Sequence, residues 1–256
     1  AIDLARDFIM RRFSAAPQRV DLRDADRHGA TFDEAAALAR PLPLLSPRGI
    51  YWATTRFAMK VGGLLSAGVK LGHETGFDSG STLDYVYRNV ATGCGPIGRL
   101  VDRLYLDSIG WRGIRQRKAH IEELLRHAME IVSADGRPIR VFDIAAGHGR
   151  YVLEALSDSK NYPESIVLRD FSELNVREGS ALIHSKGLDG IARFERGDAF
   201  DRAAVAGVEP KPTIGIVSGL YELFPENDGV SRSLAGMADA IEPGGYLLYT
   251  GQPWHP

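Results

Sequence analysis

From residue 138 onward, short runs of apolar residues alternate with longer segments in which apolar residues recur every three or four positions. The short runs predict buried strands, and the longer segments predict helices that pack on a sheet. Regular alternation of the two favours parallel strands joined by helical crossovers. The predicted strands are 139–144, 165–169, 192–196, 213–218 and 244–250, and the predicted helices are 149–157, 173–186, 201–206 and 229–241.

The first part of the chain has a helical pattern. Residues 82–110 read as helix with a break near 93–96, and residues 120–132 read as an amphipathic helix. We therefore expect an N-terminal helical cap or lid over residues 1–110, followed by the sheet domain over residues 111–256.

Residues 49–71 are apolar and contain several glycines, with an uncharged run between Lys60 and Lys70. We favour a helix that packs in the core. The alternative is a cap that lines an apolar substrate pocket or touches a membrane surface.

Composition and charge narrow the function classes. The chain has 256 residues and a formal net charge of −2, so no global field favours nucleic acid. A single cysteine, Cys94, excludes an internal disulfide and a cysteine-rich zinc site, and fits a cytoplasmic setting. No apolar run is long enough to span a bilayer.

The stretch 139–156 joins a predicted strand to a predicted helix through a turn of small residues. Gly147 and Gly149 permit backbone angles and close approach that a side chain would block. The helix start presents unpaired N–H groups to a ligand. A dinucleotide site needs G-x-G-x-x-G, but the third position is Val152, and an acid, Asp143, stands four residues before Gly147. An ordinary strand–helix turn is the remaining alternative.

The pattern D-x-x-x-G-x-G over Asp143 to Gly149 resembles motif I of class I S-adenosylmethionine (SAM) methyltransferases. Ala145 departs from it, because many members have a further glycine there. SAM carries a sulfonium and an ammonium group, so a carboxylate near the turn suits it, whereas a pyrophosphate would be repelled.

Further segments resemble later motifs of the same class. The second predicted strand ends at Asp170, where a carboxylate can accept both ribose hydroxyls, although Asp170 or Ser172 could act only as a helix N-cap. Glu173 and Asn175 read as surface residues. The segment Gly197-Asp198-Ala199 resembles the part that binds the adenine amino group and flanks the ring.

The segment 241–248 resembles the turn that precedes strand five of these enzymes, with a proline and paired glycines. Together the motifs imply a doubly wound, Rossmann-like sheet with a helical cap, and SAM as cofactor. No metal is required. The cofactor-binding residues that we expect are Asp143, Ala145, Gly147, Gly149, Arg150, Asp170, Phe171, Asp198, Ala199 and Ser218, with Tyr87, Arg112 and Arg115 from outside the sheet.

Some roles have open alternatives. Arg112 and Arg115 could pair with the SAM carboxylate, but they could also belong to a solvated helix start or a nucleic-acid patch. Tyr221 and Glu222 follow the fourth predicted strand and are candidates to orient an acceptor or take its proton. Alternatively, Tyr221 only covers the methionine end of the cofactor and Glu222 caps a helix.

A narrower resemblance covers most of the chain. The segments 76–89, 109–118, 219–227 and 249–256 are similar to a bacterial family of proteins assigned as methyltransferases of this class, often joined to an α/β-hydrolase domain. The usual sheet has seven strands and ends in an antiparallel hairpin. This chain stops after the fifth predicted strand, so we expect an incomplete sheet with the fourth strand at an exposed edge.

The leading hypothesis is therefore a SAM-dependent methyltransferase that acts on a small, apolar or lipid-like acceptor. A non-catalytic SAM- or nucleotide-binding regulatory module is the second hypothesis. An NAD-dependent oxidoreductase is the third, and Asp143 and Val152 disfavour it.

Overall fold

The computed structural model describes residues 41–43, 45–159, 161–224 and 227–251. By their contacts, the described residues divide into two units, one up to Thr54 and one from Thr55 onward. The described part of the first unit contains the beginning of helix α4 (Pro47–Leu65), which continues into the second unit. The part of the expected cap before residue 41 lies outside the described residues.

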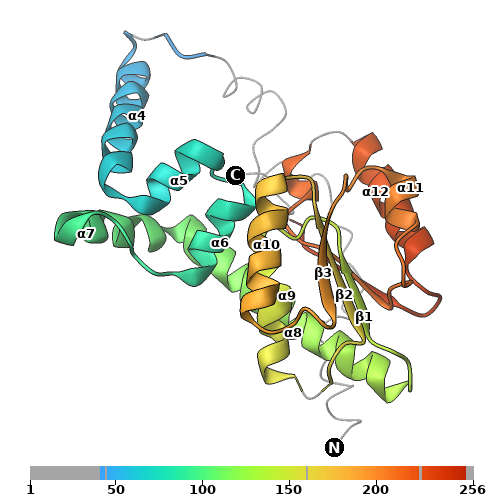
Figure 1. Ribbon diagram of the computed structural model, residues 1–256. Helices are drawn as coiled ribbons and strands as arrows, with labels where there is room; N and C mark the ends of the chain where they lie inside the picture. The colour runs from blue at the N-terminus through green and yellow to red at the C-terminus, as the bar shows by residue number, and fades with distance from the viewer. Residues whose placement is uncertain (1–40, 44, 160, 225–226, 252–256) are drawn as a thin grey trace, which may run out of the picture. The chain divides into compact units, whose positions relative to one another are not determined.

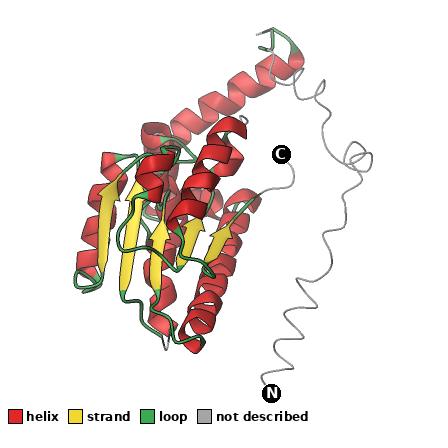
Figure 2. Ribbon diagram, turned by 90° about the vertical axis from the view of Figure 1, so that its right-hand side faces the viewer, coloured by secondary structure: helices red, strands yellow, loops and turns green. Residues whose placement is uncertain are grey.

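A sheet of five parallel strands lies in the second unit (Figure 2). Its strands are β1 (Arg140–Asp143), β2 (Ser165–Asp170), β3 (Ala192–Arg196), β4 (Ile214–Val217) and β5 (Tyr246–Tyr249). The order across the sheet is β3-β2-β1-β4-β5, and every neighbouring pair is parallel. The chain order reverses at β1, which creates a switch point at the carboxyl ends of β1, β2 and β4, where ligands of such sheets bind.

The five predicted strands are confirmed, but the expected edge is wrong. β4 pairs with β1 on one side and with β5 on the other, so β5 is the strand at that edge. Its residues are only half-buried or exposed, whereas β4 is buried throughout. The prediction assumed that an incomplete sheet would expose the fourth strand, yet the crossover after β4 places β5 outside it.

Helices cover both faces of the sheet (Figure 1). Helices α8 (Ile109–Ala134), α9 (Arg150–Ala155) and α10 (Glu173–Ser185) pack on one face around Leu125, Leu153 and Ile166. Helices α11 (Arg202–Ala206) and α12 (Asn227–Ala240) pack on the other face, around Val205 and Met237. Short 3-10 turns follow α9 and β4, at η1 (Leu156–Asp158) and η2 (Tyr221–Leu223). This arrangement confirms the doubly wound α/β fold expected from the strand–helix alternation.

Three further helices, α5 (Ala67–Thr75), α6 (Gly80–Arg88) and α7 (Gly95–Leu106), pack beside the start of α8. Asp102 of α7 joins them, because its fully buried carboxylate accepts hydrogen bonds from Ser66 Oγ (2.6 Å), Gly68 N (2.9 Å), Thr92 N (2.8 Å) and the Tyr85 hydroxyl. Burial raises the pKa of Asp102, but these hydrogen bonds outweigh it and lower the pKa. The break near 93–96 is confirmed, since α6 ends at Arg88 and α7 begins at Gly95 with Pro96 in its first turn.

The apolar stretch 49–71 is divided between α4 and α5. Val69 of α5 is buried, as a packing helix requires. In the part of α4 that belongs to the second unit, however, Phe57, Val61 and Leu64 are exposed. The prediction of a core helix is therefore wrong for this part of α4, because its apolar side chains face away from the core.

Candidate functional site

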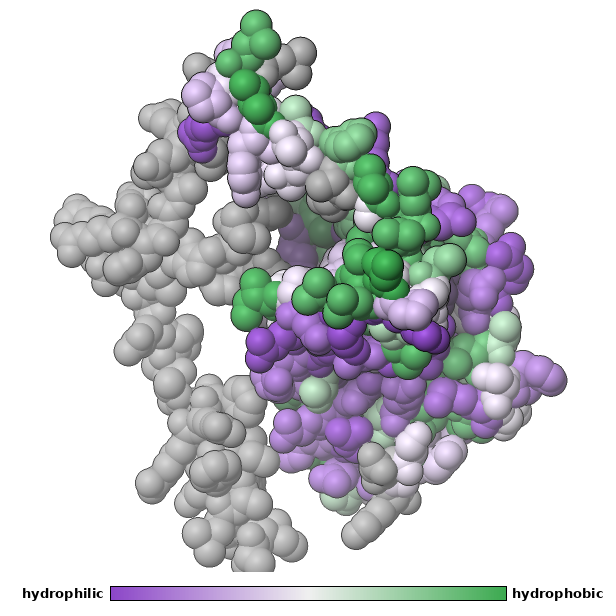
Figure 3. Space-filling model, turned by 90° about the vertical axis from the view of Figure 1, so that its left-hand side faces the viewer, coloured by the Kyte–Doolittle hydropathy of each residue, from purple (hydrophilic) through white to green (hydrophobic). Residues whose placement is uncertain are grey.

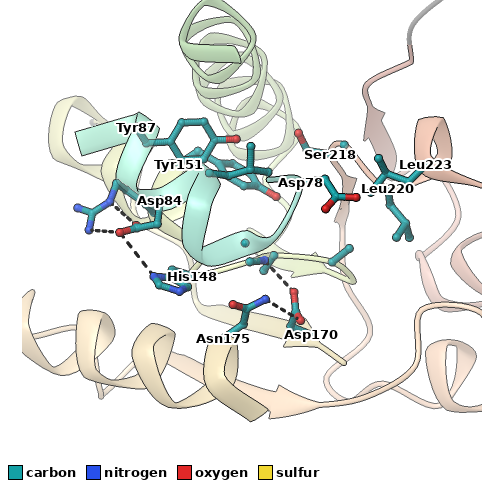
Figure 4. A pocket seen from close by; sticks show the side chains of 17 residues that line it. Asp78, Asp84, Tyr87, His148, Tyr151, Asp170, Asn175, Ser218, Leu220 and Leu223 are labelled. Carbon is teal, nitrogen blue, oxygen red and sulfur yellow. Dashed lines mark hydrogen bonds and ion pairs between the residues drawn. The ribbon is translucent and has the colours of Figure 1, made fainter. Parts of the chain in front are cut away.

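A cavity of about 180 Å³ lies at the carboxyl ends of β1, β2 and β4 (Figure 4). The sheet side contributes the glycine turn and the strand ends, and α6 contributes the opposite rim. The lining residues are Asp78, Gly80, Leu83, Asp84, Tyr87, Ala145, Ala146, Gly147, His148, Arg150, Tyr151, Asp170, Asn175, Ser218, Gly219, Leu220 and Leu223. The cavity thus occupies the switch point of the sheet.

The turn between β1 and α9 requires its two glycines. Gly147 and Gly149 have φ angles of +59° and +70°, which L side chains rarely adopt. A Cβ atom on Gly149 would lie 2.3 Å from Leu168 Cδ1, and one on Gly147 would lie 3.1 Å from Gly80 Cα. The turn is therefore pressed between β2 and the beginning of α6.

Asp170, at the end of β2, holds the glycine turn. Its Oδ2 accepts from Gly147 N (3.0 Å), and its Oδ1 accepts from Ser172 N (2.9 Å) and Asn175 Nδ2 (3.0 Å). Because an ionised carboxylate has about four lone-pair sites, one acceptor position remains, on Oδ2. Asp170 can therefore anchor the turn and still accept a hydrogen bond from a ligand.

Asp143, at the end of β1, lies beneath the turn and is fully buried. Its carboxylate accepts from Ala145 N (3.3 Å) and from the Tyr151 hydroxyl. Burial raises the pKa of Asp143 to about 7, against the opposing effect of these hydrogen bonds. Asp143, which was predicted to bind the cofactor, therefore supports the turn and does not line the cavity.

A polar network joins α6 to the glycine turn (Figure 4). The Asp84 carboxylate accepts from Arg150 Nε (2.6 Å) and lies 3.5 Å from His148 Nδ1, while His148 Nε2 lies 3.1 Å from Ser81 Oγ. Burial raises the pKa of Asp84, but hydrogen bonds from His148 and Arg150 outweigh it and lower the pKa to about 2. Asp84 is therefore ionised and fixes α6 over the turn.

This network contains the residue types of a nucleophilic triad, in Ser81, His148 and Asp84. However, Ser81 does not line the cavity, and this residue of α6 is buried against Asn175. The network therefore holds two segments together.

Residues 5–256 match the model of the protein family described as "Putative methyltransferase". The chain belongs to this family. The match confirms the class that the motifs predicted, over almost the whole chain.

The uncharacterized protein YnbC of Escherichia coli (strain K12) is 51% identical over 257 aligned residues, which cover all of this chain and 44% of YnbC. The chain therefore spans less than half the length of that relative.

A solved structure described as a possible exported protein from Bordetella parapertussis has a TM-score of 0.52 and 18% identity, covering 65% of this chain and 53% of that chain. It shares the fold. A SAM-dependent methyltransferase from Thiobacillus denitrificans in complex with S-adenosyl-L-homocysteine is similar at a TM-score of 0.35 and 21% identity, over 48% of this chain and 47% of that chain.

For this member of the methyltransferase family, the predicted site residues fall into three groups. The cavity brings together Tyr87, Ala145, Gly147, Arg150, Asp170 and Ser218. Asp143 and Gly149 support the turn from behind. Phe171 and Asp198 are exposed outside the cavity, beside the buried Ala199.

The basic residues of α8 are arranged differently from the prediction. Arg112 is exposed, and Arg115 donates to Leu106 O (2.8 Å), so neither lines the cavity. Arg117 instead packs against Gly219, where a Cβ atom would lie 2.8 Å from Arg117 Nη2, and it pairs with Glu222.

The residues proposed to act on an acceptor already have partners. The Glu222 carboxylate is paired with Arg117, and the Tyr221 hydroxyl donates to Ser233 Oγ (3.0 Å). Burial raises the pKa of Tyr221. Neither residue lines the cavity in this arrangement.

Sequence reasoning missed several lining residues. Asn175, which was read as a surface residue, is buried and donates to Asp170. Its position three residues after the N-cap Ser172 was the available signal, because that helix turn returns to the strand end. Asp78, Asp84 and His148 gave no such signal, since only the packing of α6 on the turn brings them together.

The described part of the chain has neither a metal-binding cluster nor a membrane-spanning helix. It contains no cluster of three or more His, Cys, Asp or Glu side chains suited to a metal ion. None of its helices is long and apolar enough to cross a membrane.

Proposed function

We propose that the cavity binds SAM and that the protein transfers the methyl group to a small, apolar or lipid-like acceptor. The observation that carries the proposal is Asp170. It lies at the end of β2, is tied to the glycine turn, and keeps one lone pair of Oδ2 for a ribose hydroxyl.

The residues around Asp170 fit the remaining parts of SAM. The Phe171 ring follows Asp170 in sequence and is 68% exposed although Arg196 lies over it at 5.6 Å, so part of a flat apolar surface is available to an adenine ring. Asp198 is exposed and accepts from Phe200 N (2.8 Å), which fixes a carboxylate for the adenine amino group. The cationic methionine end would lie toward Asp78 at the rim, because the Asp84 carboxylate is already paired with Arg150.

SAM supplies an activated methyl group, so the chain has to hold the acceptor in line and exclude water. Leu83, Leu220 and Leu223 give one part of the cavity an apolar wall, which suits an apolar acceptor. Because Tyr221 and Glu222 are engaged with Ser233 and Arg117, we assign them to positioning the loop after β4 and not to proton transfer.

The cavity is smaller than the roughly 300–1,000 Å³ of typical ligand sites. It encloses only part of a SAM molecule, with the adenine end outside, over Phe171 and Asp198.

We keep a cytoplasmic location and a fused or partner hydrolase domain as predictions.

A binding test separates SAM from dinucleotides. S-adenosylhomocysteine and SAM should raise the melting temperature of the chain, because a ligand at 100 times its Kd stabilises the native state by about 2.7 kcal/mol. NAD should cause no shift. Transfer of a labelled methyl group from SAM to a bacterial extract then tests catalysis. A shift with NAD and none with either SAM compound would overturn the proposal, and binding without any transfer would leave a binding module.

A further inference from the structure

Helix α7 presents an apolar stripe away from the core. Ile97, Leu100 and Leu104 recur at helical spacing and are 68%, 61% and 66% exposed. The opposite face of the same helix is buried and contains Gly98, Asp102 and Leu106. The helix thus packs on the rest of the fold through the face that contains Asp102 and Leu106, and the apolar stripe has no part in the core.

The end of α4 lies against the beginning of α7. Leu65 O accepts from Cys94 N (2.8 Å), and a Cβ atom on Gly98 would lie 2.5 Å from Leu65 O, so the two helices meet at their ends. Leu64 is 79% exposed, and Val61 and Leu65 are partly exposed beside it on the same helix. We call these six residues the apolar surface: Val61, Leu64, Leu65, Ile97, Leu100 and Leu104. Figure 3 shows hydrophobic side chains gathered in this view above a largely hydrophilic lower half.

The charges on these helices are almost all positive. Residues 55–65 of α4 contain Arg56 and Lys60 and no acid, and α7 contains Arg99 and Arg103. The acid of α7, Asp102, is fully buried and satisfied by its hydrogen bonds. Arg103 is paired with Asp107 at the end of α7 (2.8 Å), so the cations that border the apolar surface without a matching acid on these two helices are Arg56, Lys60 and Arg99.

A cleft beside Leu64 adds to this positive border. It has a volume of about 440 Å³ and is lined by Lys60, Gly63, Leu64, Lys70, His73 and Glu74. Glu74 lies 3.9 Å from Lys70, and both side chains are exposed, so the pair is weak. Lys60 has no acidic partner in the described part of the chain.

We propose that the apolar surface docks on an anionic lipid membrane, with its six side chains in the interface and Arg56, Lys60 and Arg99 against lipid phosphates. Apolar side chains flanked by Lys and Arg are the pattern that binds such surfaces, because burial of apolar area and attraction to anionic headgroups act together. The docking goes beyond the proposed methyl transfer and does not depend on it.

Sedimentation with lipid vesicles tests the docking, using the full 256-residue chain. The protein should bind vesicles of phosphatidylcholine mixed with phosphatidylglycerol and should bind pure phosphatidylcholine vesicles much less. The double variant Leu100→Glu/Leu104→Glu should bind at least about tenfold more weakly, because two apolar side chains are replaced by charges that anionic lipid repels. Leu234→Glu, at a 38% exposed position of α12, is the matched control and should bind like the parent.

A second variant tests the electrostatic part. Lys60→Gln/Arg99→Gln keeps the apolar surface and should bind mixed vesicles more weakly, with a smaller dependence on salt. The melting temperature of each variant serves as the control for folding.

Several results would overturn the docking: no binding of the parent chain to mixed vesicles, equal binding to neutral vesicles, or unchanged binding of Leu100→Glu/Leu104→Glu. Light scattering adds one more. If the parent is a dimer that the leucine variant converts to a monomer, a second copy covers the surface, and the membrane is the wrong occupant.

Discussion

Asp170 combines two tasks at the scale of a single residue. Three donors from the turn and from α10 already use its oxygens, so its carboxylate is a structural anchor as much as a ligand contact. This limits it to about one further hydrogen bond, where the sequence suggested two from a ribose diol.

Replacing Asp170 should affect binding and the turn together. Asp170→Ala removes hydrogen bonds to a charged group, each worth about 1.5–3 kcal/mol, so S-adenosylhomocysteine should bind roughly ten- to a hundredfold more weakly. Asp170→Asn should not restore binding, because an amide nitrogen on either side would face an N–H donor. Calorimetric titration measures both. Asp189→Ala, on the exposed turn before β3, is the control. Unchanged affinity in Asp170→Ala would exclude any ligand contact.

Asp143 should make stability depend on pH. Its folded pKa of about 7 lies above the value of 3.8 for an unfolded aspartate, so the folded state keeps the proton longer. The parent should therefore lose stability as the pH rises from about 4 to 7, and Asp143→Asn should lack this loss. Between pH 5 and pH 7 the variant should gain up to about 2–3 kcal/mol on the parent in urea unfolding. Parallel curves for the two proteins would mean that Asp143 is ionised when folded.

At the scale of elements, the decisive contact is that of α6 with the glycine turn. Gly80, the first residue of α6, faces Gly147 so closely that a Cβ atom on Gly80 would lie 2.6 Å from Gly147 Cα and 2.6 Å from Asn175 Nδ2. Arg150 and His148 then hold Asp84, one turn further along α6. The rim of the cavity therefore depends mainly on the close approach of the two backbones, and the charged contacts of Asp84 add to it.

Adding one methyl group should separate these elements. Gly80→Ala should cost about 1–3 kcal/mol of stability, as overpacking does, and should weaken S-adenosylhomocysteine binding. Gly113→Ala is the control, because Gly113 lies inside α8 with open space around it and should gain about 1 kcal/mol. Thermal melts and titration of both variants measure the difference. A neutral Gly80→Ala would show that α6 can move without cost.

At the scale of the molecule, the helices before the sheet and the sheet itself share one cavity. Asp78, Leu83 and Tyr87 line it from α6 and the turn before it, and Ser218 and Asp170 line it from the strand ends. Ligand binding should therefore stabilise the segments on both sides of the cavity.

Hydrogen exchange can follow this coupling. S-adenosylhomocysteine should slow amide exchange in α6 as well as in the glycine turn, because a ligand suppresses the opening of every segment that holds it. Helix α12 packs on the far face of the sheet and is the internal control. Protection of the turn without protection of α6 would remove α6 from the binding site.

Features that depend on residues close together in the sequence could be predicted, whereas contacts between distant segments could not. Strands and helices of the sheet follow a local apolar pattern, and Asp170 and Gly147 follow from motifs within one turn. Asp84 and His148 meet only through tertiary packing, so neither gave a signal. Arg117 lies three residues after Ile114 and four before Ile121, so helical spacing predicts that it packs inward, where it pairs with Glu222. The prediction of Arg112 and Arg115 considered only the number of basic residues in this stretch and not the face of the helix on which each one lies.

The facing pair Gly80 and Gly147 also has a meaning for descent. A side chain on Gly80 would press on the backbone of Gly147, and one on Gly147 would strain its own backbone and crowd Gly80, so the two behave as one inherited character although they are far apart in the chain. A lineage that changed either one would first have to lift α6 from the turn, and would then be remodelling the shape of its site.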